Sequence, residues 1–475
     1  MLFNSFNFSF IFLPIVVFTS IILKKYFHTQ FLIIFLIISS LIFYSYYYPP
    51  YIFLIMCSIF FNYMSSYLLI KYNRKKINIY IFSITILVNL VILLYYKYFN
   101  FLAQNLSVIF TLNISEKELI LPLAISFFTF QQIAFITSVY RKEISKVSFL
   151  KYSLFICFFP QLIAGPIVKF KEFCPQISLF NNNGSLNKAN ISLGLYIFCI
   201  GMLKKILISA YLASIADPIF DDLHNKVYLN ASTVWIGLVA FSLQIYFDFS
   251  GYSDMAIGLA LCFGIKLPYN FNSPYKASSL KEFWQKWHIT LSRFLKEHIY
   301  FTLGGNKNKQ TKTVFNILIT MLIGGIWHGA SWNFFIWGLY HGVFISIERI
   351  LKNFIAIKPF ILNRFFIFFI VTIGWIPFRC SDLITSEFMF DSLFFNEYLL
   401  NDKYKFSVFD FFIFGILLII TFFLPNSIKI QSFIKKNLIN RKNNHYLLLL
   451  IIGVIFLMLS EPTNNINREF IYFQF

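Results

Sequence analysis

Long apolar runs recur along almost the whole chain, and they constrain its fold more than any other feature of the sequence. Phe occurs 65 times and Tyr 28 times among 475 residues, and only 13% of the residues are charged. Soluble globular domains carry about 25% charged residues, so a water-soluble fold of this length would lack the polar side chains that cover a surface. The sequence therefore predicts an all-α, multi-pass integral membrane protein without a large soluble domain.

The apolar runs can be measured against the membrane, because a bilayer core about 30 Å thick requires about 20 apolar residues in a helix. The runs predict roughly 11–13 membrane helices, some of them short enough to be tilted or broken. The first run lacks a basic start and a small-residue cleavage site, so we expect a retained helix and not a signal peptide. The candidate spans are residues 8–23, 31–47, 51–70, 79–97, 119–139, 191–216, 231–247, 252–268, 313–328, 333–350, 359–378, 407–424 and 446–460.

We interpret these spans as one transmembrane domain. Residues 1–140 would supply N-terminal helices, residues 150–350 a catalytic core rich in motifs, and residues 351–475 C-terminal helices. Six cysteines are dispersed along the chain and none forms a CxxC pair. We therefore expect them to be small buried hydrophobic residues, with neither a disulfide framework nor a metal site.

The basic residues indicate an orientation in the membrane. The chain has 40 Lys and Arg against 20 Asp and Glu, but the basic residues lie in short loops between apolar runs, which argues against nucleic-acid binding. Loops 24–30 and 71–78 and the segment after residue 140 are basic, whereas loops 47–50 and 98–118 are not. The positive-inside rule then places the N-terminus outside and loops one, three and five in the cytoplasm, in a protein of the cell (inner) membrane.

Two segments indicate irregular backbone at membrane depth. Residues 150–168 contain two prolines and a glycine inside an apolar stretch, which predicts either a re-entrant or broken helix beside a cavity or an ordinary proline-kinked span. Lys204 and Lys205 interrupt another apolar run and indicate a helix end or a re-entrant piece there.

The stretch from about residue 244 to residue 342 contains most of the polar residues that are candidates for a functional site. It begins with two aspartates in an apolar run. An ionisable group at such a place is costly, so Asp248 and Asp254 are candidates for function. The alternative is that Gly251 breaks the helix and both carboxylates cap or pair at its ends.

Residues 279–300 show the periodicity of one amphipathic helix, as expected at a membrane interface. Ser279 is a plausible N-cap, with Glu282 three residues later as in a capping box. His288 falls on the apolar stripe, where it is either a core residue or a functional group. The basic residues of the opposite face are Lys286, Arg293 and Lys296.

The loop that follows joins two glycines to several lysines. Gly304 and Gly305 stand beside Lys307, Lys309 and Lys312. Such a loop could hold the phosphates of a nucleotide-like donor, although it is not a Walker motif, or it could be an ordinary basic cytoplasmic loop.

His328 and His341 lie 13 residues apart in an apolar stretch. In one unbroken helix they would be roughly 140° apart around the axis and about 20 Å apart along it. They can share a site only if residues 329–333 break the helix. Glycines flank His328 and would let a ligand approach closely. Histidine suits general-base catalysis on a hydroxyl nucleophile, and His288 could orient or polarise the same centre.

Eight stretches of the chain together resemble a known family. They are SFFTFQQIAF (126–135), FFPQLIAGPI (158–167), LQIYFDFSGYSDMAIG (243–258), NFNSPY (270–275), EFWQKWHITLS (282–292), LGGNK (303–307), GGIWHGASWNFFIWGLYHG (324–342) and GWIPFR (374–379). In order and content they resemble the membrane-bound O-acyltransferase family, and most of all its alginate and peptidoglycan O-acetylase branch.

The resemblance implies an α-helical bundle around a tunnel that joins the two membrane faces. It implies that His328, in the Trp-His-Gly motif, is catalytic and that His288 occupies the position of its usual companion. It also implies a cytoplasmic thioester donor, with acetyl-CoA as a substrate and no bound cofactor. The acceptor would be extracytoplasmic, either a partner acetyltransferase of the SGNH type or the glycan itself.

The chain departs from the family pattern in a few places. Lys296 and Glu297 stand where relatives usually carry Arg-Asp, Thr302 replaces a common proline, and Ala124 replaces a frequent glycine. These departures bear on how the donor docks more than on the class of reaction. The Ser-Trp-Asn that follows Trp-His-Gly-Ala favours the acetyl branch over the related D-alanyl branch.

The sequence thus predicts an O-acetyltransferase in which His328, assisted by His288, handles the proton or the acyl group. Basic side chains would attract an acidic donor such as coenzyme A or a carrier protein. Transfer of D-alanine from a carrier protein is the alternative enzyme. A lipid-linked glycan transporter is the alternative outside enzymes, although no internal repeat supports it. The predicted donor-binding residues are Lys286, Arg293, Lys296 and Lys307.

Overall fold

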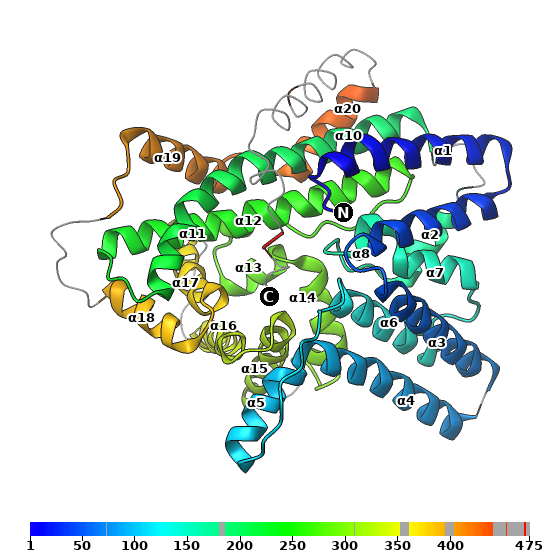
Figure 1. Cartoon of the computed structure of the whole chain (residues 1–475), viewed down its shortest axis with the longest axis horizontal. Helices are drawn as coiled ribbons and strands as arrows, with labels where there is room; N and C mark the ends of the chain where they lie inside the picture. The colour runs from blue at the N-terminus through cyan, green and yellow to red at the C-terminus, as the bar shows by residue number, and fades with distance from the viewer. Residues whose placement is uncertain are drawn as a thin grey trace. The chain divides into compact units, whose positions relative to one another are not determined.

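The computed structural model describes residues 1–72, 74–178, 180, 186–307, 309–351, 361–394, 403–439, 453, 470 and 471. Among these residues the regular secondary structure is helical and no β-strand occurs. Seven of the described helices are long and apolar enough to cross a membrane, which confirms the prediction of an all-α, multi-pass membrane protein (Figure 1).

The seven helices vary in length because several of them combine shorter elements. They are Asn7–Tyr26 (ending in α1), Tyr51–Lys71 (α3), Lys75–Phe110 (α4 to α5), Lys188–His224 (α10 to α11), Ala231–Cys262 (α12), Trp332–Leu351 (α16) and Leu362–Arg379 (in α17). Val408–Phe422 (α19) and Ser427–Lys436 (in α20) form a further pair, bent by 71°. Thr29–Ser45 (α2) and Ile125–Tyr140 (α6) are shorter apolar helices.

The prediction of separate spans at residues 231–247 and 252–268 is wrong, because α12 is one helix of 32 residues. Gly251 does not break it. A Cβ at Gly251 would lie 2.8 Å from the carbonyl oxygen of Gly201, so the glycine serves close packing between helices, as small residues do in membranes.

The predicted interruption at Lys204 and Lys205 is also wrong. The helix continues from α10 into α11 (Ala210–His224) through a π-helical turn at Lys204–Ser209. Similarly, the segment after residue 97 was expected to be a loop, but α5 (Phe99–Phe110) continues the helical path of α4. The candidate span at residues 446–460 lies outside the described residues except for residue 453.

A broken helix is present where the sequence predicts irregular backbone. Phe149–Cys157 (α7) ends before the short helix Phe159–Leu162 (α8), and this stretch is almost entirely buried. The backbone N–H of Phe159 donates to Ser40 Oγ at 3.1 Å. The side chain thereby satisfies a group that the break leaves without a helical partner, as a buried irregular segment requires.

The contacts divide the chain into two units. Most of one unit consists of Met1–Ile200 and Tyr252–Pro268, and most of the other consists of Gly201–Gly251 and Tyr269–Phe433 together with the described residues 470 and 471. In the first unit, a buried amide network joins α3, α4 and α6. Asn62 Nδ2 donates to Asn89 Oδ1 at 3.1 Å and to Gln132 Oε1 at 2.9 Å. Such interhelical amide bonds hold membrane helices together.

The second unit contains all six predicted site residues. In this unit Gln310–His328 (α15) packs against α16, and a Cβ at Gly338 of α16 would lie 2.5 Å from the carbonyl oxygen of Met321 in α15. The pair therefore packs backbone against backbone. This close contact fixes where α15 ends, and His328 is its last residue.

Candidate functional site

His288 lies in a tight turn between two short helices, so the prediction of one helix over residues 279–300 is wrong. Leu280–Lys286 (α13) ends before Trp287, and Ile289–Leu295 (α14) begins after His288. His288 itself has φ = +41°, in the left-handed region that non-glycine residues rarely adopt. Strain of this kind clusters at functional sites.

Asn270 holds this turn in place. Its carbonyl oxygen accepts from the N–H of Ile289 at 2.9 Å, and its side-chain Oδ1 accepts from the N–H of Thr290 at 3.2 Å and from Thr290 Oγ1 at 2.9 Å. His288 Nδ1 lies 3.1 Å from the same Oδ1. Because a backbone N–H can only donate, this atom is an acceptor, and Nδ1 of His288 must carry the proton.

The predicted capping box at Ser279 is half formed. Ser279 Oγ accepts from the N–H of Glu282 at 3.1 Å, as predicted. The Glu282 carboxylate, however, accepts from the N–H and the Oγ of Ser278, one residue earlier than a capping box requires. The same carboxylate pairs with Lys286 at 2.6 Å, which orients that predicted donor-binding side chain.

His328 ends α15, and α16 begins four residues later at Trp332. The helix is therefore broken between His328 and His341, as a shared site requires. The ring centroids of both histidines lie 5.0 Å from that of Trp337, each in an edge-on contact. Both side chains are buried, with 6% of His328 and 0% of His341 exposed.

Trp327 connects the two predicted catalytic histidines. Its ring centroid lies 6.1 Å from that of His288 and 4.9 Å from that of His328. His288 is 1% exposed, and burial lowers its pKa to about 3, so its imidazole is neutral at physiological pH. The structure therefore brings two histidines from distant parts of the sequence into one aromatic cluster. The other rings that contact either histidine include those of Phe249, Phe334, Trp337 and Phe378.

A cavity of about 470 Å³ reaches the turn directly after His328. Gly329, Ala330, Ser331 and Phe334 line one side of it. The ring centroid of Phe334 lies 6.4 Å from that of His328, so a single aromatic ring belongs both to the cavity wall and to the surroundings of the imidazole. The remaining lining residues come from α11 and from the segment after α17 (Ile361–Arg379): Phe220, Asp221, His224, Arg379, Cys380, Ser381 and Thr385.

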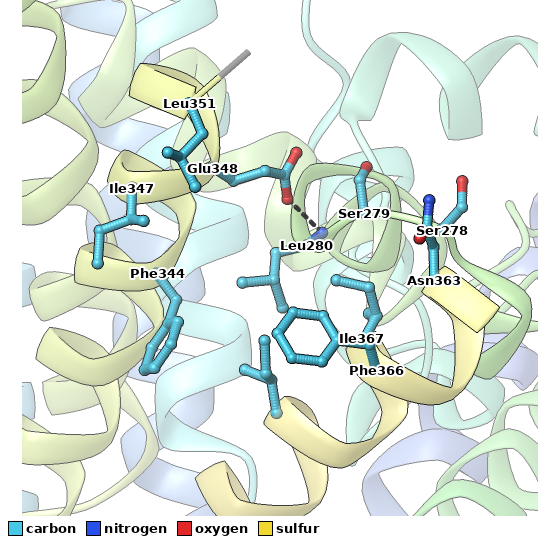
Figure 2. Close-up of a pocket in the computed structure, with 11 residues that line it drawn as sticks. Ser278, Ser279, Leu280, Phe344, Ile347, Glu348, Leu351, Asn363, Phe366 and Ile367 are labelled. Atoms are coloured by element: carbon cyan, nitrogen blue, oxygen red, sulfur yellow. Dashed lines mark hydrogen bonds between the residues drawn. The ribbon is translucent and has the colours of Figure 1, made fainter. Parts of the chain in front are cut away.

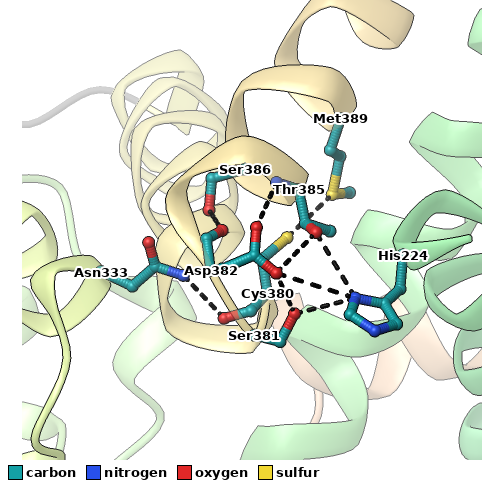
Figure 3. A network of polar contacts seen from close by, with 8 residues as sticks. All are labelled: His224, Asn333, Cys380, Ser381, Asp382, Thr385, Ser386 and Met389. Carbon is teal, nitrogen blue, oxygen red and sulfur yellow. Dashed lines mark hydrogen bonds and ion pairs between the residues drawn. The ribbon is translucent and has the colours of Figure 1, made fainter. Parts of the chain in front are cut away.

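Polar side chains bind one another along the edge of this cavity (Figure 3). Ser381 Oγ lies 2.9 Å from His224 Nδ1 and donates to Asp382 Oδ2 at 2.7 Å. Asn333, in the first turn of α16, donates to the carbonyl oxygen of Cys380 at 2.8 Å. The sequence offered no signal for His224, Ser381 or Asp382, because they are common polar residues at helix ends.

The four predicted donor-binding residues lie on different elements. Lys286 is in α13 and Arg293 in α14. Lys296 lies in the π-helical turn that follows, with its ammonium 5.5 Å from the ring centroid of Phe301. Lys307 is exposed in the loop before α15. Their role in donor binding remains a prediction.

Asp248 is an ion-paired residue behind the site. Its Oδ1 lies 2.6 Å from Lys205 Nζ, and its Oδ2 accepts from the N–H of Ile471 at 2.9 Å. Phe470, next to Ile471, contacts Phe249 with ring centroids 5.3 Å apart, and Phe249 contacts His288 at 4.7 Å. Asp248 is therefore paired as one alternative predicted, but within a continuous helix and not at an end formed by Gly251.

Comparison with known proteins gives a matching family model and several similar proteins. A family model described as MBOAT, membrane-bound O-acyltransferase family, matches residues 76–383. The peptidoglycan O-acetyltransferase of Helicobacter pylori is 41% identical over 365 residues, which cover 70% of this chain and 68% of that protein. A probable alginate O-acetylase of Azotobacter vinelandii is 39% identical over 332 residues, which cover 68% and 64% of the two chains.

The D-alanyl branch is less similar. The teichoic acid D-alanyltransferase of Bacillus subtilis is 30% identical over 246 residues, which cover 48% of this chain and 59% of that protein. The two histidines, the tryptophan between them and every residue that lines the cavity after His328 except Thr385 lie within the range that the family model matches.

Proposed function

Because the chain belongs to the membrane-bound O-acyltransferase family, and is therefore an O-acyltransferase, we propose that it moves an acetyl group from a cytoplasmic thioester to a hydroxyl group. The donor is acetyl-CoA. The product is an O-acetylated exported glycan of the cell wall or of an exopolysaccharide. The acetyl group reaches the glycan directly or through an extracytoplasmic partner acetyltransferase of the SGNH type. The names of the H. pylori and A. vinelandii relatives support this class of acceptor.

The observation that carries the proposal is the contact of Trp327 with both His288 and His328. His328 accepts the proton of the acceptor hydroxyl as its oxygen attacks the thioester carbonyl carbon. The tetrahedral intermediate then collapses, the C–S bond breaks, and the leaving thiolate takes the proton back from His328. A positioned histidine contributes about 10²- to 10⁴-fold to such a step.

His288 supports the same centre from a fixed orientation. Its Nδ1–H donates to Asn270 Oδ1, which leaves Nε2 as the nitrogen with a lone pair. With a pKa of about 3, the ring stays neutral and adds no second positive charge beside His328 when that residue is protonated. A neutral imidazole of fixed tautomer can position the acceptor hydroxyl by accepting a hydrogen bond.

The cavity after His328 supports the approach of the acceptor. It is lined by hydroxyl groups and by Arg379, and it reaches Gly329, directly after the end of α15, against which the ring of Phe334 packs. A sugar hydroxyl or a partner's serine hydroxyl entering there would meet the imidazole beside the ring of Phe334.

The test uses the purified protein in lipid nanodiscs with radiolabelled acetyl-CoA and soluble glycan oligomers. Label should move to a hydroxyl, and His328→Ala should slow the transfer about 10²- to 10⁴-fold while the variant still inserts and elutes normally. His28→Ala, which changes an exposed histidine before α2, is the matched control and should transfer normally. Full transfer by His328→Ala, or transfer only from a D-alanyl carrier protein, would refute the proposal.

A further inference from the structure

A second cavity lies between the last turns of α16 and the first turns of α17. It also measures about 470 Å³. Its lining includes Phe344 and Ile347 of α16 and Phe366 and Ile367 of α17 (Figure 2). The N–H of Leu280 donates to Glu348 at 2.5 Å at its rim, so this carboxylate is occupied by the start of α13. The interior is apolar and suits an extended, uncharged chain.

Positive charges gather beside this cavity. Burial, followed by the positive charges of Lys429, Arg364 and Lys286, lowers the pKa of Lys276, so three further cations lie within electrostatic reach of Lys276. We call Lys276, Lys286, Arg364 and Lys429 the basic cluster. Arg364 follows the lining residue Asn363, and Lys276 precedes Ser278 and Ser279, which also line the cavity. Glu282 pairs with Lys286 at 2.6 Å, and the positive charges gathered around Lys276 attract anions.

On each of the three helices that line the cavity, the residue one turn beyond the lining residues lies at or beside the same group of aromatic rings. Residues four apart lie on one helix face, and Trp284 of α13 follows Leu280 by four. Gly374 of α17 follows the lining residue Ile370 by four, and a Cβ on Gly374 would lie 3.0 Å from His341 Nε2. His341 of α16 precedes the lining residue Phe344 by three. The next turn of each helix therefore leads to the same three rings, Trp284, His341 and Trp337.

These rings carry polar atoms that nothing in the described part of the chain satisfies. Trp284 Nε1, Trp337 Nε1 and both ring nitrogens of His341 are buried and have no hydrogen-bond partner there. The rings contact one another, with centroids 5.5 Å apart for Trp284 and Trp337 and 5.1 Å apart for Trp284 and His341. A buried donor or acceptor without a partner costs about 1–3 kcal/mol, and such a group in a native protein requires an explanation.

We propose that the basic cluster, the cavity between α16 and α17, and the rings Trp284, His341 and Trp337 together form the binding site of a coenzyme A thioester. The phosphates lie at the basic cluster and the pantetheine arm runs through the apolar cavity. Its amide groups bind the indole N–H groups and His341, and the thioester reaches His328, whose ring lies 5.0 Å from that of Trp337. Along α16, the 11 residues from Trp337 to Glu348 span about 16 Å, a length that an extended arm covers.

This inference rests on the proposed acetyl transfer and places the donor site at the α16–α17 pair, whereas the sequence predicts it along residues 286–307. Of the four donor-binding residues predicted from the sequence, it retains Lys286 alone. The charge of the basic cluster indicates which ligand binds. A purely apolar ligand would gain nothing from the four cations. A thioester without phosphates would leave the four cations without a counter-charge.

The test compares thioesters that lack one part of the ligand at a time. Arg364→Gln and Lys429→Gln should each raise KM for acetyl-CoA about tenfold at nearly unchanged kcat, and should leave KM for S-acetylpantetheine, which has no nucleotide phosphates, unchanged. Lys435→Gln, which changes another exposed lysine of α20, is the matched control and should alter neither value.

The amide contacts are tested with Trp284→Phe, which keeps a ring and removes one N–H. It should raise KM for acetyl-CoA and for S-acetylpantetheine, and should leave the reaction of S-acetyl ethanethiol, which has no amide, unchanged. If the charge variants instead reduce co-purifying anionic phospholipid and leave KM for acetyl-CoA unchanged, the cavity binds lipid and the inference is wrong. If no thioester is consumed by the unmodified protein, the proposed function itself fails.

Discussion

His288 Nδ1 lies 3.1 Å from Asn270 Oδ1, an atom that also accepts hydrogen bonds from the N–H and Oγ1 of Thr290. One amide oxygen thus fixes both the left-handed backbone of His288 and the tautomer of its ring. The turn exists because Asn270, from the segment before α13, supplies these acceptors. It points Nε2 of His288 away from Asn270, and the ring lies beside Trp327.

Replacing Asn270 should therefore impair the reaction through His288. In Asn270→Ala the His288 ring loses its fixed tautomer and the turn loses the side-chain oxygen that accepts from Thr290. We expect kcat to fall about 10²-fold, since general-base catalysis contributes about 10²- to 10⁴-fold, with KM for the thioester little changed. Asn270→Asp keeps an acceptor oxygen and should retain more activity than Asn270→Ala. Equal losses in the two variants would contradict this role.

The stability of the protein should fall at acid pH because of His288. Its folded pKa of about 3 is below the ordinary value of about 6.5, so the unfolded state binds the proton first. The stability is fully present above pH 6.5 and is lost as the pH falls below it, by about 1.4 kcal/mol per pH unit. Thermal unfolding at pH 7.5 and pH 5.0 should show a drop that His288→Gln reduces. An identical drop in both proteins would contradict the assignment.

The α15–α16 contact should not tolerate a methyl group. A Cβ at Gly338 would lie 2.5 Å from the backbone oxygen of Met321, and backbone cannot move aside as a flexible side chain can. Gly338→Ala should therefore lower the unfolding temperature and the activity together. Gly415→Ala in α19, where a Cβ meets nothing within 4 Å, is the control and should stabilise by about 0.5–1 kcal/mol.

The buried ion pair predicts an asymmetric response to substitution. Asp248→Ala leaves Lys205 buried without its carboxylate, which costs about 3–5 kcal/mol, and should lower the yield of folded protein sharply. The double variant Lys205→Met with Asp248→Leu removes both charges and should recover much of that loss. The unfolding temperature in nanodiscs measures both. If the double variant is as unstable as Asp248→Ala, the pair is not the cause.

The apolar runs predicted the class of fold because the hydropathy and the length of a segment are local properties, and these two properties decide whether a helix can span a bilayer. Breaks were harder to predict. Gly251 looks like a helix breaker in sequence but serves close packing, and only the position of Gly201 shows this. Conversely, the amphipathic pattern at residues 279–300 continues through His288 although the backbone does not.

The residues of the site that stand in local motifs could be predicted from the sequence, whereas those that depend on contacts between distant segments could not. His328 and His288 stand in motifs, and their placement around one tryptophan is observed. Asn270 was part of a quoted motif, but its role depends on a contact across 18 residues. The basic cluster consists of residues between position 276 and position 429. No local sequence pattern predicts that residues so far apart in the chain lie near one another.

The measurement that tests the account most directly is a double-mutant cycle on kcat for acetyl transfer with His288→Ala, His328→Ala and the combined variant. If both imidazoles serve one reacting centre, their effects are not additive. The double variant should then be no slower than His328→Ala alone. If the two losses multiply, or if His328→Ala retains its rate, the two histidines do not act together and the proposed site is wrong.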